Sequence, residues 1–185
     1  MATIREGRRS VLVVVDVQVD VVRNAWERSR VIGNVALAVE RARAQGVPVV
    51  WVQHEDEDMP RDSAGWQWVP ELAPREGDVR VFKRFASSFE DTPLEAELAR
   101  LGATRLVLAG AQTNWCIRAT AYGALDRGYD LTLVRDAHTT DPADLGNGRV
   151  IPAESFVDDL NLAMTWLAYP GRKPTTAQAA ALDFA

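Results

Sequence analysis

The chain has 185 residues, 47% of them hydrophobic and 25% charged, which is enough to bury one core and is typical of one domain. We therefore predict a single domain over residues 1–185. The formal net charge of -5 disfavours nucleic acid and anionic membrane surfaces as partners. No stretch approaches the roughly 18 apolar residues of a membrane span, and residues 1–10 lack the apolar segment of a signal peptide. A single cysteine excludes an internal disulfide and favours a reducing, cytoplasmic location.

The first half of the chain alternates strand and helix patterns. Residues 11–17 (VLVVVDV) are a continuous, mostly β-branched run, typical of a strand that is covered on both faces. Apolar side chains recur at helical spacing over residues 31–44, and Gly46 then marks the end of a helix. Two further strands are predicted at 49–52 and 79–82. The stretch between them is rich in proline and glycine and is the least regular part of the sequence.

The second half repeats the alternation. Thr92 and Pro93 are typical of a helix start, and an apolar stripe then runs to Leu101. The remaining expected elements are a strand at 105–109, a helix near 116–127, a strand at 131–134, a helix near 154–168 and a C-terminal tail over 170–185 with too little pattern to assign. Repeated βα units predict an α/β protein with three α-β-α layers and a mostly parallel sheet.

Three chemically capable side chains follow three of the predicted strands. Asp16 and Lys83 stand at strand ends, and Cys116 follows a strand through a short turn, so all three should meet at the carboxyl edge of a parallel sheet. A lone cysteine is more often a small buried hydrophobe. However, a thiol at a helix N-terminus beside a lysine should be more acidic than usual, so we predict a lowered pKa for Cys116. An ionised Asp16 in an apolar run needs a partner.

The composition gives Lys83 a separate significance. Only two of the 21 basic residues are lysines, Lys83 and Lys173, so the chain uses arginine almost wherever a generic positive charge suffices. An ammonium can approach a thiolate and a carboxylate as a compact point charge, whereas a guanidinium requires planar partners. The alternative is a solvated surface lysine. We favour a lysine that holds the thiolate of Cys116 and orients Asp16.

Three segments together resemble a known family. VLVVVDVQVD, KRFASSFEDTPLEAEL and LVLAGAQTNWCIRATAYGALDRGYDLTLVRDA look like the signature blocks of the isochorismatase-like cysteine hydrolases, in the same order. The resemblance implies a six-stranded parallel sheet and a catalytic triad of Asp16, Lys83 and Cys116. It also implies a cis peptide between Ala111 and Gln112, with the backbone N–H groups of Gln112 and Cys116 forming an oxyanion hole.

The sequence departs from the family pattern near Asp16, where the usual asparagine and phenylalanine are replaced by Val19 and Val21. Metal-dependent nicotinamidases of this kind carry an Asp-x-His pair after the second strand, which this chain lacks. We therefore predict no metal site and no organic cofactor. The acidic run over residues 55–58 is interpreted as a solvated loop, although carboxylates of this kind also bind hard cations.

Five residues near the three blocks are candidate substrate contacts, namely Gln18, Trp66, Phe85, Ser87 and Trp115. An aromatic loop residue such as Trp66 can instead cover the core or pack against a neighbouring subunit. We expect a homo-oligomer, either a dimer or a tetramer, that acts on a small-molecule substrate.

The predicted reaction is hydrolysis of a small amide or related C–N bond through a thioester on Cys116. Two alternatives remain open. One is cleavage of a vinyl ether such as isochorismate, in which Asp16 acts as the acid and the cysteine is dispensable. The other is a non-catalytic α/β scaffold, because a fold does not fix a function. A nucleotide-binding module is disfavoured because the turn after the first strand, residues 16–20, contains no glycine.

Overall fold

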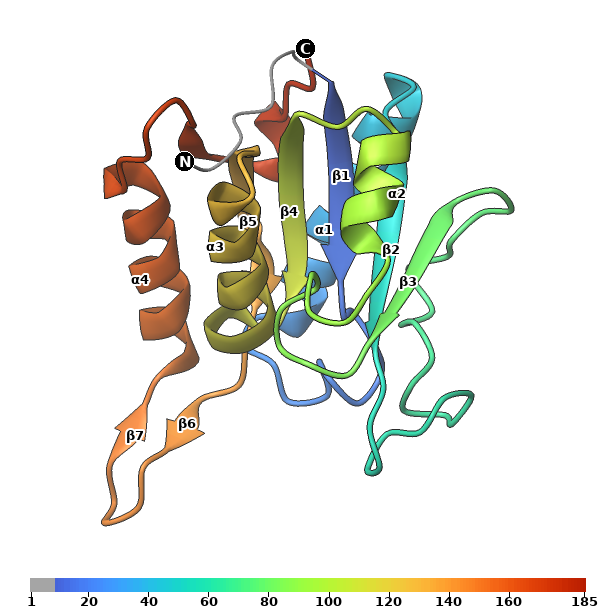
Figure 1. The fold of residues 1–185 in the computed structure, drawn as a ribbon. Coiled ribbons are helices and arrows are strands. Elements are labelled where there is room, and N and C mark those ends of the chain that lie inside the picture. Colours follow the sequence, from blue (N-terminus) through green and yellow to red (C-terminus); the bar gives the residue numbers. More distant parts are fainter. Residues whose placement is uncertain (1–8) are drawn as a thin grey trace.

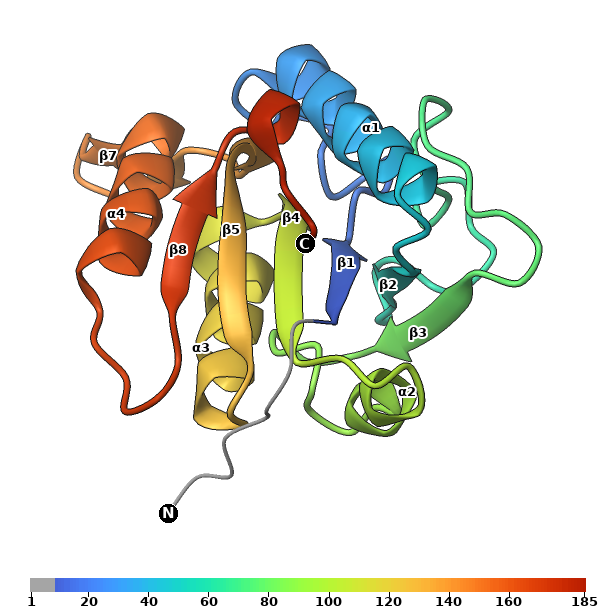
Figure 2. The same cartoon turned by 90° about the horizontal axis from the view of Figure 1, so that it is seen from above.

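The computed structural model describes residues 9–185 and contains a six-stranded parallel sheet with helices on both faces (Figures 1 and 2). The strand order is β3-β2-β1-β4-β5-β8, and every neighbouring pair is parallel. The predicted three-layer α/β fold is therefore confirmed. The strands of this sheet are β1 (Ser10–Val15), β2 (Val49–His54), β3 (Val79–Lys83), β4 (Arg105–Ala111), β5 (Asp130–Thr139) and β8 (Pro174–Ala177).

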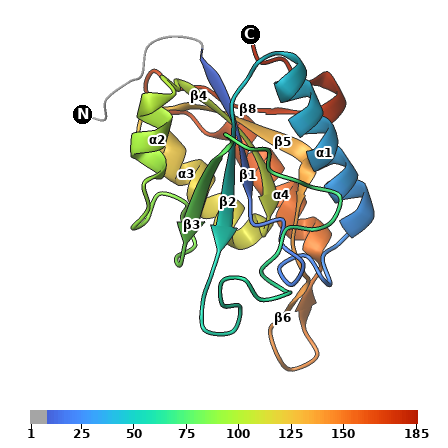
Figure 3. The same ribbon diagram turned by 90° about the vertical axis from the view of Figure 1, so that its right-hand side faces the viewer.

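Each face of the sheet has its own apolar core. Helix α1 covers one face, together with a short 3-10 turn at Ala179–Ala181, and α2, α3 and α4 cover the other. Figures 2 and 3 show α1 on the opposite side of the sheet from α2 and α3. Every residue of β1 is buried, which explains its continuous apolar sequence. No helix in residues 9–185 is long and apolar enough to cross a membrane. The helices are α1 (Arg28–Ala44), α2 (Leu94–Arg100), α3 (Arg118–Asp126) and α4 (Ala153–Trp166).

The C-terminal tail completes the sheet. Pro174–Ala177 forms β8, which pairs with β5 at the edge, and the Thr132 and Thr175 hydroxyls lie 3.0 Å apart across this pair. Phe184 is buried on the α1 face. This strand is short and polar, as edge strands often are, so no sequence pattern predicts it. A hairpin of β6 (Ala143–Asp144) and β7 (Val150–Ile151), also not predicted, projects from the carboxyl end of the sheet (Figure 1).

The direction of the chain changes between β1 and β4. The strands β2 and β3 lie to one side of β1, whereas β4 and β5 lie to the other, which makes the carboxyl ends of β1 and β4 a topological switch point. The two strands approach closely there. A Cβ on Gly110 would lie 2.0 Å from the Val15 carbonyl oxygen, and Gly110 has a φ of 128°, so only glycine fits this position. Gly110 thus permits the contact beside Asp16.

Candidate active site

Asp16 lies directly after β1, at the switch point. Its backbone has a left-handed φ of 51°, and its N–H donates to the Val52 carbonyl at 2.9 Å. Few residues other than glycine adopt this conformation, although aspartate tolerates it better than most. The turn directs a fully buried carboxylate toward the end of the sheet, where it meets Lys83.

Lys83 joins the other two predicted triad residues. It is the last residue of β3, its side chain is buried, and its Nζ lies 2.7 Å from Asp16 Oδ2 and 3.2 Å from Cys116 Sγ. Nζ also donates to the Phe85 carbonyl at 3.2 Å and lies 3.4 Å from His54 Nδ1. The three side chains therefore converge as predicted. The surface-lysine alternative is wrong, because a buried ammonium with these partners is not solvated.

Cys116 lies in a π-helical turn, Thr113–Ile117, between β4 and α3. The peptide bond between Ala111 and Gln112 is cis, as the family resemblance implied. The Cys116 side chain is only partly buried and lines a cavity of about 370 Å³. The turn thus places the one thiol of the chain where a small molecule can reach it, next to Lys83 Nζ.

The prediction of a lowered pKa for Cys116 is wrong. Burial, and then the negative charge of Asp16, raise the pKa of the Cys116 thiol to about 12, and the opposing effect of Lys83 is smaller. Burial also raises the pKa of Asp16, although Lys83 opposes that shift. Burial alone would lower the pKa of Lys83, but the charges of Asp16 and Cys116 outweigh it and raise that pKa. At neutral pH the resting site therefore holds an ammonium and a neutral thiol.

His54 contacts Lys83 and lines the cavity beside Cys116. It ends β2, beside Lys83 in the strand register, and its Nε2 lies 2.9 Å from Asp56 Oδ2. Because an ammonium can only donate, Nδ1 must accept from Lys83, so Nε2 carries the proton that is given to Asp56.

Only one of the five predicted substrate contacts lines the cavity beside Cys116. That residue is Trp115, whose side chain is exposed. Phe85 lines an adjacent pocket with Lys83, and Ser87 Oγ accepts from the Phe89 N–H at 3.3 Å. Trp66 is buried, with its ring centre 5.9 Å from that of Phe82.

The fifth predicted contact, Gln18, bonds backbone groups of the protein and does not line the cavity. Its Nε2 donates to the carbonyls of His54 and Trp66, both at 2.9 Å, and its Oε1 accepts from the His54 N–H at 2.9 Å. The side chain is fully buried and ties the loop after β2 to the end of β1. Gln18 therefore positions His54.

Much of the cavity wall is not predicted by the sequence patterns. Residues that line it without having been predicted as contacts are Asp20, Val21, His54, Asp56, Asp58 and Met59. The loop over residues 55–58 had been considered only as a solvated or cation-binding segment. Its position beside β3, which brings it to Cys116, depends on long-range strand pairing, so no local sequence pattern could have revealed it.

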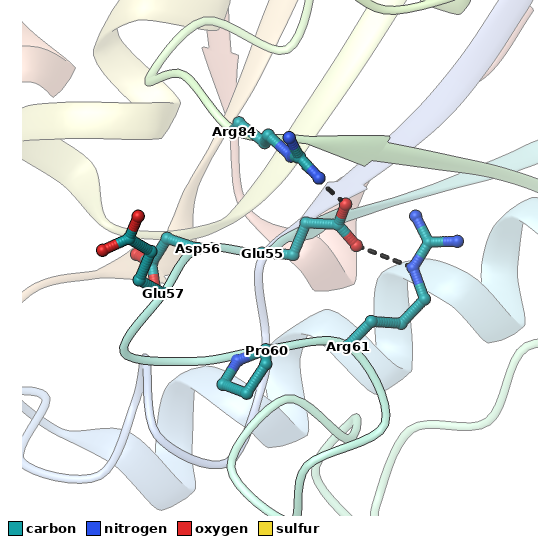
Figure 4. A pocket seen from close by; sticks show the side chains of 6 residues that line it. All are labelled: Glu55, Asp56, Glu57, Pro60, Arg61 and Arg84. Atoms are coloured by element: carbon teal, nitrogen blue, oxygen red, sulfur yellow. Dashed lines mark hydrogen bonds and ion pairs between the residues drawn. The ribbon is translucent and has the colours of Figure 1, made fainter.

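A second hollow adjoins this cavity (Figure 4). Its volume is about 650 Å³ and it shares Asp56 with the cavity of Cys116. Glu55 lies between two guanidinium groups, 2.7 Å from Arg61 Nε and 3.5 Å from Arg84 Nε. These ion pairs account for the Glu55 carboxylate, and no group of three or more potential metal-binding side chains occurs in residues 9–185.

The turn that carries Cys116 is held by side chains from several elements. Gln112 Nε2 donates to the Val21 carbonyl at 3.1 Å. Thr113 Oγ1 lies 2.9 Å from Nδ1 of His138, whose Nε2 lies 3.1 Å from Asn161 Oδ1 on α4. Burial lowers the pKa of His138 to about 4, so this imidazole is neutral at pH 7. His138 thus joins the turn to α4.

Known proteins share the sequence pattern and the fold of this chain. The isochorismatase domain family matches residues 10–146. The chain is 39% identical over 154 residues to streptothricin hydrolase of Streptomyces noursei. The matched segment spans 77% of this chain and 60% of that protein. It is 28% identical over 186 residues to ureidoacrylate amidohydrolase RutB of Methylobacterium radiotolerans, covering 81% of this chain and 72% of that one.

A solved structure supports the same assignment. The crystal structure of an isochorismatase from Pseudomonas putida KT2440 superposes with a TM-score of 0.84 at 26% identity, covering 95% of this chain and 90% of that one. The fold and site together therefore define an α/β protein of the isochorismatase-like hydrolase class. The chain belongs to the isochorismatase family.

Proposed function

We propose that this protein hydrolyses the C–N bond of a small amide, with Cys116 as nucleophile, Asp16 as proton carrier and Lys83 as the cation that holds both. The observation that carries the proposal is the single buried Nζ within 3.2 Å of Sγ and 2.7 Å of a carboxylate oxygen, beside a cavity that a small molecule can enter. The name of one relative, ureidoacrylate amidohydrolase RutB, agrees with this choice of bond.

The raised pKa of the thiol defines the first step. Because Cys116 is neutral at rest, its proton must move to Asp16 as Sγ attacks the carbonyl carbon of the amide. The carbonyl oxygen becomes an oxyanion, for which the backbone N–H groups of Gln112 and Cys116 are the proposed donors. Asp16 then passes the proton to the leaving nitrogen, the C–N bond breaks and a thioester remains on Cys116.

The second half of the cycle uses the same groups. Asp16 takes a proton from water, the resulting hydroxide attacks the thioester carbon, and the acid product leaves as the proton returns to sulfur. Lys83 stays protonated throughout, which its raised pKa favours. Its ammonium compensates the negative charge of the site, whether that charge is on Asp16 or on Sγ. The reaction consumes one water and regenerates the thiol, so it needs no organic cofactor.

The test is turnover of a panel of small amides, ureides and vinyl ethers by the wild type, Cys116→Ala and Cys116→Ser. Removal of a covalent nucleophile should lower amide turnover by at least about 10³-fold, and a thioester adduct should be trapped on the wild-type chain at low temperature. Vinyl ether cleavage that survives Cys116→Ala would instead support the isochorismatase-type reaction. Absence of turnover in the wild type across the panel would favour a non-catalytic scaffold.

The lone thiol also bears on location. Cys116 has no second cysteine in its chain with which to form a disulfide, and its proposed role requires it to remain reduced. We therefore propose a reducing compartment such as the cytoplasm. Fractionation of cells that express the chain, followed by labelling of the free thiol, tests this placement.

A further inference from the structure

The cavity beside Cys116 has an unbalanced set of charges. Four of its lining residues are aspartates, namely Asp16, Asp20, Asp56 and Asp58, and none of the described lining residues is a lysine or an arginine. A cleft lined by charges of one sign concentrates ligands of the opposite sign. The chemistry of the lining therefore bears on which amides can enter.

Two of these carboxylates are neutralised by cations outside the wall. Asp16 is paired with Lys83, and Asp20 forms an ion pair with Arg23. Asp56 has no lysine or arginine partner among residues 9–185. Its Oδ2 lies 2.9 Å from His54 Nε2, and the carboxylate accepts from the backbone N–H groups of Met59, at 2.7 Å, and Asp58. Burial alone would raise the pKa of Asp56, but these hydrogen bonds outweigh it and lower that pKa, so the carboxylate is ionised at neutral pH.

Asp58 is the least compensated of the four. It is exposed and has no ion-pair partner among residues 9–185. Asp56 and Asp58 therefore contribute negative charge that Lys83 and Arg23 do not balance. In the adjoining hollow, Arg61 and Arg84 contact Glu55, and neither forms an ion pair with Asp56 or Asp58 in the described chain (Figure 4).

The same wall also carries apolar and aromatic side chains. These are the apolar Val21 and Met59, together with Trp115, whose side chain is 61% exposed. An exposed indole stabilises cations through its π face.

From this geometry we infer that the substrate is a cationic amide, in which an aliphatic stem joins the scissile C–N bond to an ammonium or guanidinium group. The inference rests on the proposed amide hydrolysis and names the substrate class for it. Asp56 and Asp58 recognise the cation. The stem contacts Val21, Met59 and Trp115, and Cys116 attacks the carbonyl. Anionic amides are excluded by the same carboxylates.

The first test reads the charge of the cavity without any turnover. Because Cys116 is the single thiol, its rate of modification can be compared for cationic trimethylammonioethyl methanethiosulfonate and anionic sulfonatoethyl methanethiosulfonate, each relative to free mercaptoethanol. The cationic reagent should be favoured about tenfold or more at low salt, and the preference should decline at 1 M salt as charges become screened. A cation-to-anion ratio equal to that of mercaptoethanol overturns the inference.

Matched variants assign the effect to the wall. Asp58→Asn and Asp56→Asn should each lower the cation preference about threefold to tenfold. Glu40→Gln removes the same charge from an exposed position of α1 outside the cavity and should leave the ratio unchanged. Equal losses in Asp58→Asn and Glu40→Gln would mean that only net charge matters, which contradicts a recognition site.

The second test uses substrates that share one reacting bond. The amide of ε-aminocaproic acid, heptanamide and the monoamide of adipic acid present a cation, a methyl group and an anion at the end of a similar stem. We expect kcat/KM to fall in that order, and the advantage of the cation to shrink in Asp58→Asn. Hydrolysis of all three at equal kcat/KM overturns the charge inference and leaves amide hydrolysis standing. Charge-selective labelling of Cys116 with no hydrolysis of any amide defeats the proposed function instead.

Discussion

Asp16→Asn separates the acidity of the thiol from its reactivity in catalysis. Asparagine keeps the size of the side chain but removes its negative charge. In the wild type, Lys83 Nζ contacts both this carboxylate and Cys116 Sγ. Both atoms contact the same ammonium, so they lie at most about 6 Å apart, where two charges interact by roughly 2–3 kcal/mol at an effective dielectric constant near 20. That energy corresponds to about two pKa units, since one unit is about 1.4 kcal/mol.

The thiol pKa should therefore fall from about 12 to roughly 10 or below in Asp16→Asn, because Cys116 then becomes the anion that neutralises a buried Lys83. At pH 8 the thiolate fraction, and with it the rate of alkylation by iodoacetamide, should rise about 100-fold. Amide hydrolysis should change in the opposite direction and fall at least about 100-fold, because the proton carrier is lost.

Alkylation is followed by intact mass, where the single cysteine gives one adduct. Asp56→Asn is the matched control, since Asp56 lines the same cavity but contacts His54 and the Met59 N–H rather than Lys83 Nζ. It should alter the alkylation rate by only a few-fold. If Asp16→Asn alkylates no faster than the wild type, the charge of Asp16 is not what holds the thiol neutral, and the proposed first step is refuted.

Three further predictions concern stability and assembly. Gln18→Ala should lower the free energy of unfolding by about 2–4 kcal/mol in a urea titration, because it leaves buried backbone partners at His54 and Trp66 unpaired; a change below about 1 kcal/mol would contradict its positioning role. Folding holds His138 neutral down to a pKa of about 4, against 6.5 ordinarily, so its contribution of about 3 kcal/mol is complete above pH 6.5 and lost as the pH falls toward 4. His138→Gln should therefore weaken the dependence of unfolding free energy on pH in that window, and an unchanged dependence would count against a buried neutral imidazole. Sedimentation velocity should detect a species larger than the 20.4 kDa monomer, since the exposed Leu162 and Trp166 of α4 are available to a second copy; a monomer at micromolar concentration would exclude the expected homo-oligomer.

Much of the fold follows from local sequence patterns. The apolar run of β1 and the spacing of α1 predict their own burial, and alternating βα units leave few topologies besides a parallel sheet. The strand ends then bring Asp16, Lys83 and Cys116 to one edge. These elements could be predicted because their signals lie within single segments of the chain.

The parts that could not be predicted depend on contacts between distant segments. The strand β8 has the sequence PTTA, which becomes a strand only because β5 offers an unpaired edge. Gln18 resembled a substrate contact because it stands two residues after Asp16, yet its amide is occupied by backbone groups of His54 and Trp66, 36 and 48 residues away. No local pattern encodes either pairing.

The acidity of Cys116 illustrates how such contacts determine chemistry as well as shape. The helix start and Lys83, both visible in the sequence, favour a thiolate, but burial and the charge of Asp16 depend on packing and outweigh them. One ammonium between two acidic groups can compensate only one negative charge, and the carboxylate is the stronger acid, so the thiol keeps its proton. Asp16 can then serve as the base in attack and as the acid in departure of the leaving group. A site with a resting thiolate would already have given up the proton that the leaving nitrogen requires.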